Sequence, residues 1–203
     1  LASHRTVLDG GGVAKHVVVG ADNARIDGFT IRGGNANGAA PDNTGGGVFC
    51  NGTSPVVANN RIVGNTASGE GGGLFCAGSC AAQVVGNTFA GNGAGNAGVA
   101  AYFYSPGAYL FEGNIVTAHA DNTSGRILLR LEGSLGRAGG NLIAGNGNRW
   151  NRLLYASVPL DNNVVLGNRV YGYSRVNVGL WLGGTRAALR NNTIGHHDRD
   201  VVT

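Results

Sequence analysis

The chain of 203 residues has no methionine, a single lysine and few charged side chains, which make up 13% of it. Lys15 is that lysine, and fourteen arginines are scattered along the rest of the chain. No basic cluster therefore indicates a nucleic-acid partner. A run of about 18 apolar residues is also missing, so we expect no membrane-spanning helix.

Glycine is abundant, at 38 of 203 residues, and it interrupts every window in which a helical pattern of apolar residues could develop. Between the glycines lie short apolar runs of three to five residues, each bounded by Gly or Asn. Such runs are typical of short β-strands. Because 42% of the residues are hydrophobic, the chain can still bury a core. We therefore expect an all-β fold.

One phrase, an asparagine followed by an apolar run, recurs at nearly constant spacing. Its first three steps are 27 residues each, and the next two are 22 and 29 residues. Such a period is typical of a solenoid in which neighbouring coils share a core. We predict a right-handed parallel β-helix of about seven coils, formed as one domain over residues 1–203 of a longer chain. The lead asparagines are Asn60, Asn87, Asn114, Asn141, Asn163 and Asn192.

These asparagines have a predicted structural role at a corner between two strands. A corner needs a residue near the left-handed conformation, which Asn tolerates, and stacked Asn amides can hydrogen-bond along the rod. We expect the lead asparagines to form a structural ladder, with Phe29 in their position in the first coil. A second ladder is expected at Asn65, Asn92, Asn146 and Asn168, with His119 and His197 in the same position in two other coils.

The three cysteines leave two interpretations open. Cys76 and Cys80 could close a small disulfide loop, with Cys50 stacked beside Cys76 one coil away. Alternatively, all three are buried thiols in the core.

An apolar stripe is expected on one face of the rod. If the residues on either side of Phe49 point inward, alternation along the strand sends Phe49 outward. Phe75 follows one coil later, with Ala101 and Leu128 next in line. Such a stripe would be a ligand platform or an assembly surface, although the opposite assignment places the phenylalanines in the core.

Paired Gly-Gly-apolar and apolar-x-x-Asn motifs alternate along the chain. In this respect the sequence resembles the repeats of polymorphic outer-membrane proteins and of large bacterial surface proteins with pectate-lyase-like β-helices. The resemblance covers nearly the whole chain and is cleanest over residues 24–146. It implies a right-handed parallel β-helix and a place at a bacterial cell surface. The motifs that carry it include Gly45–Phe49, Ile62–Asn65, Gly71–Phe75 and Phe89–Asn92.

Acidic residues do not gather in one region of the sequence. The eight Asp and three Glu include Asp9, Asp27, Asp161 and Asp198, which are far apart in phase or in coil. A hydrolase would need clustered carboxylates, and a pectate lyase a calcium cage of them. We therefore lean against an enzyme and predict no metal site and no cofactor.

The later coils carry a group of arginines with acidic and aromatic neighbours. Arginine can bind the carboxylates of an acidic glycan through two parallel hydrogen bonds. The alternative is a solvated charged face that keeps a sheet from aggregating. The candidate ligand-binding residues are Arg126, Arg130, Glu132, Arg149, Arg152, Tyr155 and Trp181.

The leading hypothesis is an extracellular or cell-surface bacterial module that acts as a scaffold, adhesin or assembly element. Its expected partners are a polysaccharide, a host or cell surface, or further copies of itself, and not nucleic acid. One alternative is a carbohydrate-active enzyme, a lyase or glycoside hydrolase acting on acidic polysaccharide. A second alternative is a self-assembling fibre subunit.

Overall fold

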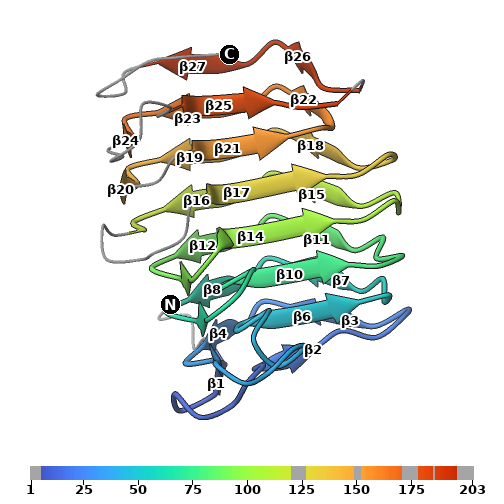
Figure 1. Cartoon of the computed structure of the whole chain (residues 1–203), viewed down its shortest axis with the longest axis vertical. Helices are drawn as coiled ribbons and strands as arrows, with labels where there is room; N and C mark the ends of the chain where they lie inside the picture. The colour runs from blue at the N-terminus through green and yellow to red at the C-terminus, as the bar shows by residue number, and fades with distance from the viewer. Residues whose placement is uncertain (1–5, 120–126, 149–151, 171–177, 185, 196–203) are drawn as a thin grey trace, which may run out of the picture.

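A computed structural model of the chain describes residues 6–119, 127–148, 152–170, 178–184 and 186–195. These residues form strands and turns without any helix, and so none that is long and apolar enough to cross a membrane. Strands of successive coils stack above one another to form a rod (Figure 1). The predicted all-β solenoid is confirmed.

Each strand pairs in parallel with the equivalent strand of the next coil, in three long sheets that we name A, B and C. Sheets B and C have seven strands each and hence six steps between coils, which gives about six turns, close to the seven predicted. In Figure 1 the strands of sheet B face the viewer and run from left to right while the chain climbs, which is the right-handed sense.

The strands are short, and most have three to five residues. Sheet A contains β1 (Val7–Asp9), β4 (Thr30–Arg32), β8 (Arg61–Val63), β12 (Thr88–Ala90), β16 (Ile115–Thr117), β19 (Leu142–Ala144), β23 (Val164–Leu166) and β27 (Thr193–Gly195). Sheet B contains β2 (Val18–Val19), β6 (Val48–Asn51), β10 (Leu74–Ala77), β14 (Ala97–Tyr104), β17 (Ile127–Glu132), β21 (Arg152–Ala156) and β25 (Val178–Leu182). Sheet C contains β3 (Arg25–Asp27), β7 (Val56–Ala58), β11 (Gln83–Val85), β15 (Leu110–Glu112), β18 (Arg137–Gly139), β22 (Pro159–Asp161) and β26 (Ala188–Arg190).

Two smaller sheets lie between sheets A and B along the chain. One joins β5 (Asn35–Ala36), β9 (Thr66–Ala67) and β13 (Gly93–Ala94), and the other joins β20 (Gly147–Asn148) and β24 (Arg169–Val170).

The core consists of columns of stacked apolar side chains, to which each of the three long sheets contributes. In sheet A the central residue of each three-residue strand points inward while its neighbours point out, as strand alternation requires. Ile62, Phe89 and Val116 occupy this position in successive coils, and all three are fully buried. Because the inward side chains of successive coils lie directly above one another, neighbouring coils bury each other's apolar face.

The lead asparagines form the predicted ladder at the corner between sheets C and A. Oδ1 of Asn87 accepts two hydrogen bonds from the preceding coil, one from the backbone N–H of Asn60 (2.9 Å) and one from its Nδ2 (3.1 Å). Asn87 in turn donates to Oδ1 of Asn114 through the same two groups. The pattern continues through Asn141 and Asn163 to Asn192. At the other end, the N–H of Phe29 donates to Oδ1 of Asn60, so Phe29 holds the ladder position of its coil.

The expectation that the lead asparagines adopt the left-handed conformation is wrong. Positive φ falls instead on the residue just before each of them, for example Asn59 (54°) and Gly86 (66°). The lead side chain must point inward to reach the ladder, so the sharp change in chain direction is made one residue earlier. Glycine holds that preceding position in several coils because it adopts positive φ without a steric penalty.

The second ladder, at the far end of the sheet A strands, is confirmed but contains a gap. Asn65 donates to Oδ1 of Asn92, and His119 and Asn146 continue the column one and two coils later. His119 is 1% exposed, and its Nδ1 lies 3.0 Å from Oδ1 of Asn146. Its Nε2 has no hydrogen-bond partner, so the link from Asn92 to the next coil is missing. His197, the other predicted substitution, lies outside the described residues.

The cysteines follow the first of the two interpretations. Cys76 and Cys80 form a disulfide, and Cys50 is a buried free thiol paired in register with Cys76 on the neighbouring strand. Burial raises the pKa of the Cys50 thiol to about 12, so it stays protonated and unreactive.

Asn87→Ala is expected to lower the free energy of unfolding by about 3 kcal/mol, because it leaves buried donors and acceptors of two neighbouring coils without partners. Urea denaturation at neutral pH measures the change. Asn96, which is exposed and whose side chain donates to the carboxylate of Glu70, provides the matched control. Asn96→Ala should cost under about 1 kcal/mol, and equal losses in the two variants would contradict a special role for the ladder.

His119→Asn is expected to remove an acid-sensitive step. Burial lowers the pKa of His119 to about 4 in the folded chain, against 6.5 for the free side chain. Below pH 6.5 His119 becomes protonated in the unfolded chain but stays neutral in the folded chain. The free energy of unfolding therefore falls as the pH drops toward 4. Between pH 7 and pH 4.5 the native chain should lose roughly 2.5 kcal/mol more than the variant does.

Urea unfolding of both proteins at the two pH values checks this prediction. The carboxylates contribute equally to the two proteins, so the difference isolates His119. Identical pH dependence would show that protonation of His119 carries no folding cost.

Candidate functional site

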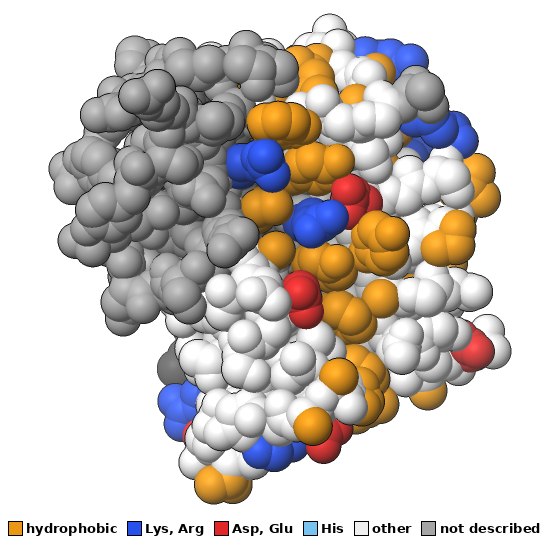
Figure 2. All heavy atoms as spheres, viewed as in Figure 1, with side chains coloured by type: hydrophobic (Ala, Val, Ile, Leu, Met, Phe, Trp, Pro, Cys, Tyr) orange, Lys and Arg blue, Asp and Glu red, His pale blue; other side chains and the backbone are white. Residues whose placement is uncertain are grey.

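The outer face of sheet B carries one side chain per coil in a single straight column. Register pairing aligns these side chains across six successive strands. We name this set the aromatic–arginine column, and its members are Phe49, Phe75, Tyr102, Arg130, Tyr155 and Trp181. Figure 2 shows hydrophobic side chains running as a stripe over this face, with basic and acidic side chains set into it.

The lower half of the column is a continuous stack of rings. The ring centroids of Phe49 and Phe75 lie 5.6 Å apart and those of Phe75 and Tyr102 lie 5.4 Å apart, with planes within 6° of parallel. His16 covers the free face of Phe49 at 4.5 Å. Because the rings cover each other's faces, they turn their edges toward solvent, and ring edges carry the positive part of the aromatic quadrupole.

The predicted outward direction of Phe49 and Phe75 is confirmed, but the continuation through Ala101 and Leu128 is wrong. Both of those residues are buried, and Tyr102 and Arg130 hold the outward positions. The coils differ in length, so the column does not continue at the 26-residue step that separates the phenylalanines. A shift in strand register between Ala97 and Ala101 contributes to this difference.

In the upper half an arginine takes the place of a ring. The guanidinium of Arg130 lies 5.3 Å from the ring centre of Tyr102 and 5.4 Å from that of Tyr155, which makes cation–π contacts on both sides. Its Nε and Nη2 donate to one carboxylate oxygen of Glu132, at 2.8 and 2.6 Å. Burial and a hydrogen bond to Glu132 raise the pKa of Tyr155. The carboxylate of Glu132 thus compensates the charge of Arg130 within the site.

Arg152 differs from Arg130 because no carboxylate among the described residues pairs with it. Its guanidinium lies 4.0 Å from the ring centre of Trp181 and 6.0 Å from that of Tyr155. Its Nε is buried and has no hydrogen-bond partner. The two rings thus hold a cationic group in place without a carboxylate partner among the described residues, which suits an anionic or oxygen-rich ligand.

Five of the seven candidate binding residues come together on this face: Arg130, Glu132, Arg152, Tyr155 and Trp181. The other two, Arg126 and Arg149, lie outside the described residues. Tyr102 belongs to the site but was not predicted from the sequence. It lies within the strand Ala97–Tyr104, and the register that aligns it with Phe75 cannot be read from residue spacing alone.

Two carboxylates that stood out in the sequence, Asp9 and Asp27, lie far from the aromatic–arginine column. Asp9 pairs with Arg32 and Asp27 with Arg25, at the first coils of the rod. In the described parts of the chain, no three His, Cys, Asp or Glu side chains are grouped closely enough to hold a metal ion. Comparison with known proteins finds no family model, no curated protein and no solved structure that matches this chain.

Arg130→Ala is expected to lower the free energy of unfolding by roughly 2 kcal/mol, because it opens the column and leaves Glu132 partly buried without its partner. The control is Arg137→Ala, which removes an exposed arginine with a long ion pair (3.7 Å) and should cost under about 1 kcal/mol. Urea denaturation of both variants tests this. Equal small losses would show that Arg130 contributes nothing through the rings.

Proposed function

We propose that this chain is a glycan-binding module of a bacterial extracellular or cell-surface β-helix protein, and that the aromatic–arginine column binds acidic polysaccharide. One observation carries the proposal: Arg152 is braced between Tyr155 and Trp181 with no carboxylate paired to it among the described residues. A chain of uronate residues lying along the rod would place a carboxylate against this guanidinium. The exposed ring edges of the lower coils would add weakly positive contacts along the same line.

Two further features support an extracellular setting. The Cys76–Cys80 disulfide is of a kind that persists in oxidising environments outside the cytosol. The motifs shared with polymorphic outer-membrane and pectate-lyase-like repeat proteins favour a bacterial cell surface. In that setting the solenoid would act as a scaffold that displays a long binding face, as an adhesin does.

Arg152→Ala is expected to weaken binding of polygalacturonate by about 10- to 100-fold, because a charge-assisted hydrogen bond is worth roughly 1.5–3 kcal/mol. Isothermal titration of the whole chain measures the affinity, with dextran as the uncharged polymer. Arg61→Ala, on the exposed outer side of sheet A, is the matched control and should leave the affinity unchanged. Raising the salt concentration should weaken the native interaction.

Two results would overturn the proposal. One is an affinity for polygalacturonate that Arg152→Ala leaves intact, and the other is equal binding of dextran and polygalacturonate. The competing enzyme hypothesis is checked in the same samples by following unsaturated uronate and reducing ends, with calcium present. Release of either product by the native chain would favour a lyase or a hydrolase over a scaffold. Self-assembly into fibres stays a prediction.

A further inference from the structure

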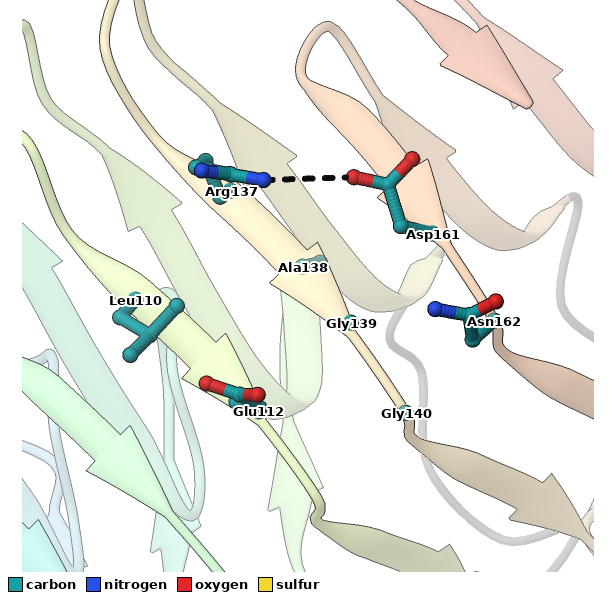
Figure 3. Close-up of a pocket in the computed structure, with 8 residues that line it drawn as sticks. All are labelled: Leu110, Glu112, Arg137, Ala138, Gly139, Gly140, Asp161 and Asn162. Atoms are coloured by element: carbon teal, nitrogen blue, oxygen red, sulfur yellow. Dashed lines mark ion pairs between the residues drawn. The ribbon is translucent and has the colours of Figure 1, made fainter. Parts of the chain in front are cut away.

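A groove of about 440 Å³ lies on the outer face of sheet C, away from the aromatic–arginine column. It falls within the range of roughly 300–1,000 Å³ that is usual for sites that bind small ligands. Figure 3 shows its arrangement, with Glu112 on one side of Gly139 and with Asp161 and Asn162 on the other. Three successive coils contribute to it, through β15, β18 and β22.

The groove exists because one coil lacks an outward side chain. Register pairing places Glu112, Gly139, Asp161 and Arg190 in one column, one residue per coil. Gly139 is the one member of this group without a side chain. Glu112 and Asp161 therefore face each other across an empty rung, with their strands two rungs or about 9.6 Å apart.

Neither the backbone nor the packing requires glycine at this position. The φ angle of Gly139 is not positive, unlike that of the neighbouring Gly140 (61°). A Cβ atom added to Gly139 would meet the carbonyl oxygen of Asp161 at 3.4 Å, which is ordinary contact. The absence of a side chain at Gly139 thus leaves the groove open and serves no other structural need.

The charges around the groove balance. The carboxylate of Asp161 lies between two guanidiniums, with Arg137 at 3.7 Å and Arg190 at 3.8 Å. Together with Glu112 this makes two negative and two positive groups, so the groove offers no net charge to an ionic ligand. Metal binding is not indicated either, because the described residues include no group of three suitable ligands.

The groove does offer unused hydrogen-bonding groups. The Arg137 to Asp161 separation is beyond hydrogen-bond distance, so each group can still bond to a ligand atom. Asn162 adds an exposed amide that both donates and accepts, and Leu110 adds a small apolar surface. Mixed donors and acceptors beside a small apolar patch match a sugar ring, whose hydroxyls donate and accept and whose C–H face is apolar.

We propose that this groove binds a short neutral saccharide, with a sugar ring seated over Gly139 between Glu112 and Asn162. The site is separate from the acidic-glycan face on sheet B, and the inference does not depend on that proposed function. A neutral saccharide held here would give the module a second glycan contact on another side of the rod.

The experiment fills the groove. Gly139→Phe places a ring in the empty rung, on a strand where aromatic residues are well accommodated. Gln83→Phe is the matched control, since Gln83 is also exposed on sheet C and lies outside the groove. The probes are hexasaccharides of β-1,4-linked glucose, mannose and galactose, titrated into the native chain and both variants while backbone amide chemical shifts are recorded.

At least one probe should bind the native chain and shift the amide signals of Gly139 and Gly140. Gly139→Phe should weaken that binding at least tenfold, and Gln83→Phe should change it less than twofold. Melting temperatures verify that both variants fold.

Three outcomes would overturn the inference: no binding by any probe, binding that Gly139→Phe leaves unchanged, or binding that is lost in Arg152→Ala instead. The last would place the saccharide on sheet B. Failure here leaves the uronate affinity of the sheet B face intact, because that affinity is measured with a different polymer and a different variant.

Discussion

From the coil of Asn60 onward, each coil is joined to the next through an asparagine whose Oδ1 accepts two hydrogen bonds from the asparagine one coil before. The rest of the structure depends on this contact. It fixes the corner between sheets C and A, and with it the register of the strands on either side. A slip of one residue would turn every side chain to the opposite face. The straight outer columns on sheets B and C therefore depend on the asparagine ladder, although no residue of either column belongs to it.

The ladders could be predicted from the sequence because asparagine recurs at a constant spacing where a corner must be satisfied. Their backbone could not, because the residue in the left-handed conformation is the one just before the recurring position. Spacing shows which position repeats but not which of two neighbours makes the turn.

The functional surfaces were only partly predictable, for a related reason. Arg130, Arg152, Tyr155 and Trp181 stood out by residue type, but their alignment with Phe75 depends on coils of unequal length. The coil is 27 residues long from Phe75 to Tyr102, 28 from there to Arg130 and 25 from there to Tyr155. The groove on sheet C gave no signal, because it arises from the absence of one side chain in a chain with 38 glycines.

The missing link between Asn92 and His119 has a mechanical consequence. Along the first corner every coil is tied to the next by side-chain hydrogen bonds, whereas the second corner lacks one tie at this point. A solenoid pulled along its axis carries the load through whatever bridges adjacent coils. Under tension the two halves of this rod would begin to separate at the second corner, between β12 and β16, and open there like a hinge held by the intact first corner.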